Sequence, residues 1–249
     1  MQVFTISLAR VSVPLALDSL YRPLRVPGLV HAESLTLMEL GAPIVSHKRL
    51  QLRQLITFAA WESEDAIDEF LTSTPLGHAV NSGWHLRMMF LRRWGSVKAL
   101  EGLPEEVEPF DPAAPVAAFT LARMRLPEVP RFIRWGRPVE ALVRDDPHST
   151  FALAAIRHPN TVATFSIWNS QQDMVNMVRG HGSQPDPKRH IRAMQERNRR
   201  DFHHEFAVLR FRPLAEHGQW NGMSSLLPAE SGRHHMSNHS GTAKGNVST

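Results

Sequence analysis

The chain has 249 residues, a formal net charge of +4 and no cysteine. Its length is enough for one large domain or two small ones, and the lack of cysteine excludes disulfides, zinc–thiolate sites, iron–sulfur clusters and a thiolate-ligated haem. The basic residues are mixed with Asp and Glu instead of forming one face with interleaved aromatic residues, which argues against a nucleic-acid-binding protein.

The first half of the sequence predicts strands and helices in the order β-α-β-β-α-β. Pro14 suits the first turn of a helix, and Leu55–Trp61 is almost entirely apolar, which predicts a strand buried on both faces. Ser63 is a good N-cap for an amphipathic helix that breaks near Pro75. The expected elements are a strand at 2–11, a helix at 14–22, strands at 35–40 and 55–61, a helix at 63–81 and a strand at 84–94.

The second half predicts the same order after a linker rich in Pro and Glu, which should be extended. Ser170 caps a short helix, the glycine-flanked His181 ends it, and Asp186-Pro187 starts another helix. The expected elements are a strand at 116–125, a helix at 127–143, strands at 150–156 and 162–168, helices at 170–178 and 187–202, and a strand at 206–211. The expected divisions are a first unit at 1–100, the linker at 101–115, a second unit at 116–228 and a polar, disordered tail at 229–249.

Two short motifs occur once in each half. The pattern T-F-x-x-W-x-S spans Thr57–Ser63 and returns at Thr164–Ser170, and the apolar run Leu8–Pro14 returns at Leu121–Pro127. The repeats predict a duplicated domain. The order β-α-β-β-α-β is that of a ferredoxin-like unit, whose sheet carries helices on one face only. We therefore expect an α+β protein of two tandem ferredoxin-like units packed sheet to sheet, an internal version of a dimeric α/β barrel.

Several segments resemble the spheroidene monooxygenase family of carotenoid-modifying enzymes. They are Val162–Trp168, Ile191–Met194 and His217–Gly222, with a looser match at Arg131–Gly136, and the resemblance covers roughly residues 2–222. It implies an oxygenase that contains haem b and uses O2 and an external electron donor, which a partner protein could provide, to insert oxygen into an apolar substrate such as a carotenoid or isoprenoid. It assigns no iron ligand and no catalytic residue.

The second half supplies the candidate residues for such a site. Without cysteine, a haem iron needs His, Met or Tyr, and the candidate ligands are His181, His190, His203 and His204. On adjacent positions of a strand, His203 and His204 point to opposite faces, so one of them can point inward.

The helix expected at 187–202 carries the other candidates. Ile191, Met194, Asn198 and Phe202 would form its inward stripe, with His190 at the edge. Arg189 and Arg192 could pair with haem propionates, although a solvated charged face is the alternative interpretation. The pocket is expected between the sheet and its own helices, lined by Trp168, Phe165, Met194 and Phe202.

Two other functions stay open. One is a cofactor-free α/β-barrel monooxygenase or a protein that only binds a hydrophobic ligand, and the other is a structural or regulatory partner protein. No apolar run approaches the roughly 18–20 residues of a membrane span, and Val3–Leu8 predicts a strand instead of a signal sequence. We expect a cytoplasmic protein, with peripheral membrane contact left open.

Overall fold

The structure is a computed structural model that describes residues 2–42, 46–182 and 184–228. The expected tail at 229–249 lies outside the described residues. The first-half elements are β1 (Val3–Arg10), α1 (Val13–Tyr21), β2 (Leu29–Met38), η1 (His47–Arg49), β3 (Gln51–Trp61), α2 (Glu64–Ser73), α3 (Pro75–Asn81) and β4 (Trp84–Ser96). After η2 (Lys98–Leu100) come β5 (Val116–Met124), η3 (Leu126–Glu128), α4 (Val129–Arg144), β6 (Ser149–Arg157), β7 (Thr161–Trp168), α5 (Gln171–Val178), α6 (Arg189–Arg199) and β8 (His203–Gly218).

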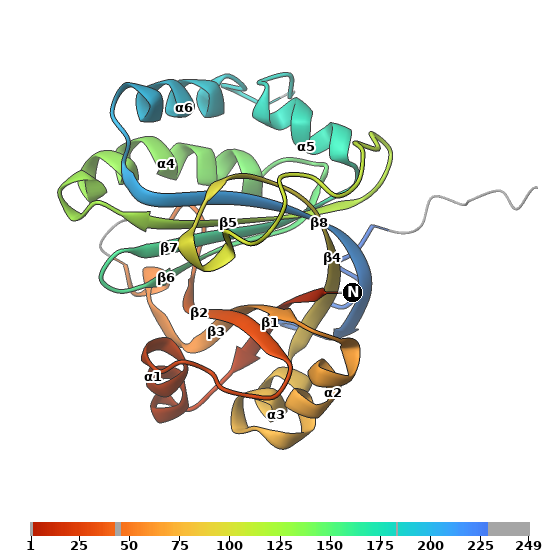
Figure 1. Ribbon diagram of the computed structural model, residues 1–249. Coiled ribbons are helices and arrows are strands. Elements are labelled where there is room, and N and C mark those ends of the chain that lie inside the picture. The colour runs from red at the N-terminus through yellow and green to blue at the C-terminus, as the bar shows by residue number, and fades with distance from the viewer. Residues whose placement is uncertain (1, 43–45, 183, 229–249) are drawn as a thin grey trace, which may run out of the picture.

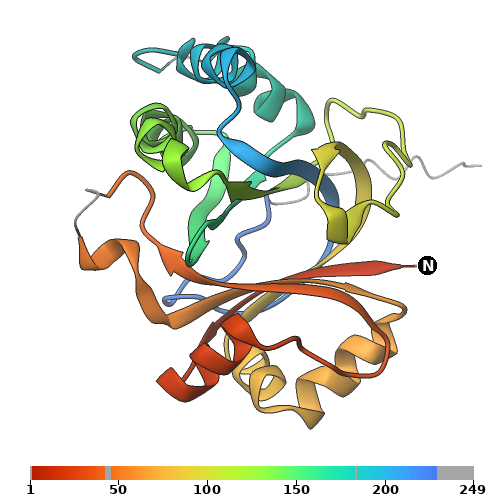
Figure 2. The same ribbon diagram turned by 60° about the vertical axis from the view of Figure 1, so that its left-hand side comes forward.

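The strands close into one barrel in the order β1-β3-β2-β6-β7-β5-β8-β4. Within it, the first-half strands follow the order β4-β1-β3-β2 and the second-half strands the order β8-β5-β7-β6, so the two halves share one topology. Antiparallel pairs β4–β8 and β2–β6 join them. Helices α1–α3 cover one side and α4–α6 the other (Figures 1 and 2). The predicted fold class is confirmed, while the duplication itself stays a prediction.

The barrel interior is one apolar core to which both halves contribute. Phe58 of β3 stacks on Phe119 of β5 with ring centroids 4.6 Å apart, and Phe4 of β1 lies 5.2 Å from Phe211 of β8. Each half thus covers the sheet face that carries no helices in the other half. Burial of this much aromatic surface is the main force that holds the halves together.

An ionic cluster closes one end of the barrel. Glu33 of β2, only 3% exposed, accepts hydrogen bonds from Arg123 of β5 (2.8 Å) and Arg157 of β6 (2.5 Å). Burial alone would raise the pKa of Glu33, but the contact with His31 and the charges of the two arginines outweigh it and lower the pKa to about 2. The carboxylate therefore stays ionised and links the halves.

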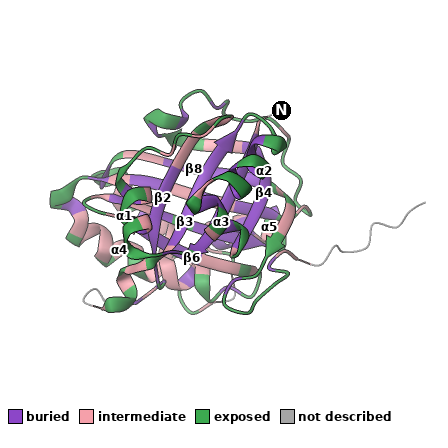
Figure 3. Ribbon diagram, turned by 90° about the horizontal axis from the view of Figure 1, so that it is seen from below, coloured by how far each residue is buried: buried purple, intermediate pink, exposed green. Residues whose placement is uncertain are grey.

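The first-half helices pack closely on their sheet. Ser63 accepts a hydrogen bond from the Ala66 backbone, as its N-cap role requires, and α2 buries Ala66, Ile67, Phe70 and Leu71. The predicted break near Pro75 separates α2 from α3. As a result, β1 is almost entirely buried behind these helices, and β3 is buried from Leu55 to Trp61 (Figure 3).

Some boundaries differ from the sequence-based expectation. Strand β8 is much longer than predicted because it pairs with β4 along most of its length, and α6 is shorter at both ends. The linker also packs against β4 instead of running free: the Val107 backbone donates to Leu91, and Leu103 is buried in the barrel core. No helix in the described ranges is both long and apolar enough to cross a membrane.

Candidate functional site

Part of the second-half sheet is accessible to solvent on the side that faces its helices. Thr164, in the middle of the interior strand β7, is exposed. Its counterpart in the repeated motif, Thr57 of β3, is only 4% exposed. An interior strand covered by helices normally buries such a residue, so α4–α6 lie above the sheet without filling the space over it.

The neighbours of Thr164 are also partly accessible. Thr120 on β5 lies directly opposite it, and Val208 on β8 lies opposite Thr120. We call this surface the accessible face and define it by five half-buried or exposed residues of β5, β7 and β8: Ala118, Thr120, Val162, Thr164 and Val208. Small side chains form its floor.

Helix α4 forms one wall. Its sequence is strongly amphipathic, yet it buries only Leu142, while Phe132, Trp135, Val139 and Val143 are half-buried. By contrast, α2 buries four residues within ten. The apolar stripe of α4 therefore presents surface above the accessible face that no side chain of the described chain covers completely.

Apolar packing closes one end of this space. Met174 and Met177 of α5 pack in one buried cluster with Trp168. The partly buried Ala118, Val143 and Val178 pack against this cluster. The Trp168 indole donates to Ser166 (2.8 Å). Trp168 thus lies in a packed core at this end.

Helix α6 turns His190 toward the sheet side. Ala193 is its buried residue, with half-buried His190 and Arg197 three positions before and four after it. The Arg197 guanidinium lies over the Phe206 ring of β8 at 3.8 Å, so this face of α6 looks toward the sheet. Burial lowers the pKa of His190, and contact with the Val178 backbone opposes the shift only partly. A neutral imidazole at neutral pH keeps a lone pair for a metal.

The inward face of α6 is formed by other residues than the sequence analysis expected. Asn198 is exposed and Ile191 packs near Gly180, whereas the inward face runs through His190, Ala193 and Arg197. The aliphatic part of an arginine packs well against apolar side chains while its charged end reaches a partner. Arg197 can therefore lie on the inward face, where the sequence pattern did not place an arginine.

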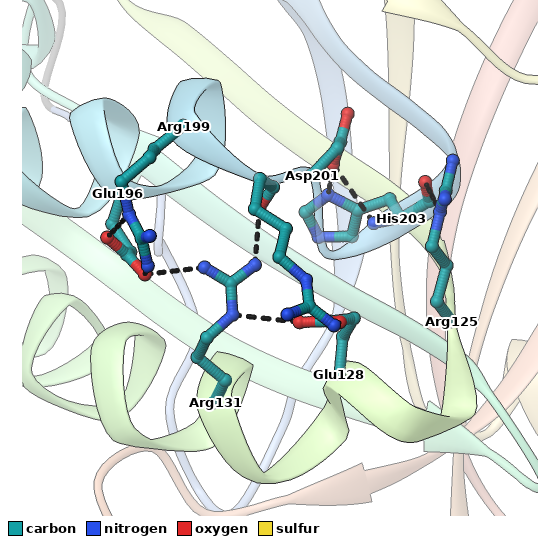
Figure 4. A network of polar contacts seen from close by, with 8 residues as sticks. Arg125, Glu128, Arg131, Glu196, Arg199, Asp201 and His203 are labelled. Carbon is teal, nitrogen blue, oxygen red and sulfur yellow. Dashed lines mark hydrogen bonds and ion pairs between the residues drawn. The ribbon is translucent and has the colours of Figure 1, made fainter.

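Gly180 lets the start of α6 approach α5. Its φ is +70°, and a Cβ there would lie 3.0 Å from the Pro187 carbonyl oxygen. At the other end, Arg131 of α4 donates to Glu128 (2.8 Å), to Glu196 of α6 (2.5 Å) and to the Arg200 carbonyl (Figure 4). Hydrogen bonds from Arg199 and Arg131 lower the pKa of Glu196 to about 2. Helix α6 is thus anchored at both ends.

His203 lies at the other end of the accessible face. It is 5% exposed, surrounded by Phe132, Phe202 and Phe206, and its Nδ1 lies 2.9 Å from Asp201 Oδ1. Its Nε2 is buried and has no hydrogen-bond partner among the described residues. Burial lowers the pKa of His203 more than Asp201 raises it, so the ring is neutral.

The other predicted ligands lie outside the site. His181 and His204 are exposed, and the inward residue of the pair at the start of β8 is His203. Arg192 pairs with Asp186 beside an open hollow of about 530 Å³ on the outer side of α6. Arg189 is half-buried, and its Nε has no partner in the described chain.

The four predicted pocket residues are divided in the same way. Phe165 points into the barrel core, 6.3 Å from the Trp84 ring, and cannot reach the helix side. Trp168 and Phe202 are buried at opposite ends of the accessible face, and Met194 is half-buried on α6. Thr164 was missed because a threonine in an apolar strand gives no sign of exposure.

A metal ion held only by side chains has no place in the described ranges, where no cluster of three or more His, Cys, Asp or Glu residues could bind one. A cofactor that brings most of its own iron ligands needs only one side chain. Haem is such a group. His203 offers a buried ring nitrogen, His190 offers a half-buried imidazole, and burial lowers the pKa of both rings.

No family model matches the chain, and no curated protein matches it. Among solved structures, the aldoxime dehydratase OxdRE in complex with butyraldoxime is similar at 11% identity, over 86% of this chain and 80% of that chain, with a TM-score of 0.51. A putative monooxygenase from Lactobacillus acidophilus NCFM is similar at 8% identity, over 88% and 97% of the two chains, with a TM-score of 0.36. At 11% identity, the likeness to the aldoxime dehydratase establishes the fold alone.

Proposed function

We propose that the chain is a haem-dependent monooxygenase that holds an apolar substrate against the accessible face. The observation that carries the proposal is the exposure of Thr164 on an interior strand beneath helices. Ligand sites are typically concave and mainly apolar with a few polar groups, and the apolar stripe of α4 above a floor of small side chains fits that description. The resemblance in the sequence supports the choice of haem and of an apolar substrate.

The residues present fit haem. We assign His190 as the residue that would hold the haem iron, because its imidazole is neutral, faces the sheet side and contacts the Val178 backbone, which orients the ring. Bound there, haem would supply the activation of O2, with reducing equivalents from an external donor. The half-buried α4 residues would exclude water and orient the substrate, and Arg131 would hold α6 in place.

Haem uptake with two histidine variants tests the proposal. The purified protein reconstituted with haem should show a Soret band, and His190→Ala should lose the iron–imidazole signature. His181→Ala is the matched control, because His181 is exposed beside the same helix. The absence of haem uptake by the wild type would refute the haem proposal, and an unchanged spectrum in His190→Ala would refute the ligand assignment.

A second function has one specific observation in its favour. The Asp201–His203 pair holds a neutral imidazole with Nδ1 fixed by a carboxylate and Nε2 free, an arrangement suited to a general base. A cofactor-free monooxygenase of an activated aromatic compound could use it. Oxygen-dependent turnover by haem-free protein that is lost in His203→Gln would favour this function over the first.

A further inference from the structure

Arg210 of β8 is a buried arginine that has no charge partner in the part of the chain that the structure describes. It is 9% exposed and lies opposite Ala118 of the accessible face, two residues from Val208 on the same side of the sheet. Among the described residues, no carboxylate pairs with it and its Nε has no hydrogen-bond partner. A charge removed from water without a counter-charge is costly, so such a residue needs an explanation.

The residue opposite Arg210 adds to the imbalance. Arg92 of β4 is its direct cross-strand neighbour, and both guanidinium carbons lie 4.2 Å from the Trp94 ring centroid. Glu106 neutralises Arg92 at 3.3 Å. Burial, together with the charge of Arg92, lowers the pKa of Arg210 to about 10, so it remains protonated at neutral pH.

The first half shows what such an arginine ordinarily has. Arg87 of β4 lies opposite Thr5 of β1, and the repeated motif Leu8/Leu121 makes Thr5 the counterpart of Ala118. Arg87 is therefore the counterpart of Arg210, and it is equally buried at 9% exposure. Unlike Arg210, it pairs with two carboxylates of α2, Glu64 (2.9 Å) and Asp68.

The second half keeps the arginine and lacks both acids. Because Ser63 and Ser170 are equivalent N-caps, Glu64 and Asp68 correspond to Gln171 and Val175 of α5. The position that requires a negative charge in the first half is thus neutral beside the accessible face. A ligand bound on that face would be the natural source of the missing charge.

We propose that Arg210 is the carboxylate-binding residue of the accessible face. Within the proposed function, on which this assignment rests, the carboxylate is a haem propionate, and an apolar carboxylic acid is the other source of the same chemistry. Guanidinium and carboxylate form paired hydrogen bonds, and Trp94 holds the guanidinium plane in position. The expected propionate partner Arg192 is instead paired with Asp186 outside the site.

Binding titrations with the full chain test the assignment. Haem should bind Arg210→Met about 10–100-fold more weakly than the wild type, since a charged hydrogen bond is lost. Arg210→Lys should recover part of this loss. Haem dimethyl ester, which has no carboxylate, should bind the wild type and Arg210→Met equally. Arg87→Met, the matched control, should bind haem as the wild type does.

Thermal unfolding of the ligand-free variants separates this role from a structural one. Arg210→Met should leave the Tm unchanged or raise it, because an uncompensated charge is removed. Arg87→Met should lower the Tm slightly, because it removes the ion pairs with Glu64 and Asp68. Equal haem affinity of Arg210→Met and wild type would overturn the assignment.

The same set of proteins distinguishes the two proposals. If the wild type binds no haem but binds palmitate, followed by tryptophan fluorescence, and Arg210→Met loses that binding, the haem proposal fails and the carboxylate site stands. If neither haem nor palmitate binds, both fail. If haem binds and the Arg210 variants do not differ from the wild type, only the carboxylate site fails.

Discussion

Replacing a threonine by phenylalanine at equivalent positions of the two halves should have opposite consequences. Thr57 is buried beneath the first-half helices, and its Oγ1 lies 3.0 Å from Ser34 Oγ. Thr57→Phe overpacks the site, at a cost of about 1–3 kcal/mol, and leaves Ser34 without its partner, at a cost of about 1–3 kcal/mol. The free energy of unfolding should fall by about 2–6 kcal/mol.

Thr164→Phe should be nearly neutral. Thr164 is exposed, so the phenyl ring enters open space, and surface substitutions usually change stability by less than about 0.5 kcal/mol. Phenylalanine also suits a strand. The stability difference between the two variants should therefore be about 2 kcal/mol or more.

Urea unfolding followed by circular dichroism measures this difference. With an m-value of about 3 kcal/mol/M, 2 kcal/mol moves the midpoint by about 0.7 M. Thr164→Phe should also lose most of its haem or palmitate binding, because the ring occupies the floor of the accessible face. A loss of stability in Thr164→Phe as large as in Thr57→Phe would refute the existence of the open space.

Two further predictions concern pH. The folded-state pKa of Glu33 is about 2 against an ordinary 4.5, so its contribution is fully present above pH 4.5 and is lost as the pH falls to about 2. This amounts to about 3 kcal/mol, and Glu33→Gln should remove that slope from unfolding curves measured across this range. Burial, then the charges of His217 and Arg87, lower the pKa of His85 to about 4 from 6.5. Between pH 6.5 and 4, His85 is therefore protonated in the unfolded chain and neutral in the folded chain, so stability falls as the pH drops through this range. His85→Phe should flatten that part of the curve of stability against pH.

The order of elements could be predicted because its signals are local. The caps Ser63 and Ser170 and the break at Pro75 depend on neighbouring residues, and all three occur as expected. The repeated T-F-x-x-W-x-S motif predicted two equal units. Because each unit has one sheet face without helices, the two faces must cover each other, which predicted the barrel.

The candidate site was only partly predictable. His190 and His203 were among the expected ligands, but only the fold shows that these two face inward while His181 and His204 face solvent. The phase of α6 was missed because its arginines pack through their aliphatic stems. The unpaired state of Arg210 could be found only after strand pairing identified Arg87 as its counterpart.

By itself, then, the sequence determined which segments are helices and strands and that the halves share one plan, because capping, proline and apolar periodicity act over a few residues. The tertiary structure decided that β4 pairs with β8 and β2 with β6 to close the barrel, and that Thr164 is exposed beneath the second-half helices while Thr57 is buried beneath the first-half helices. Those outcomes depend on contacts between residues far apart in the chain, where side-chain volume and charge on facing elements must match. A local sequence pattern cannot predict how the side chains of such facing elements fit together.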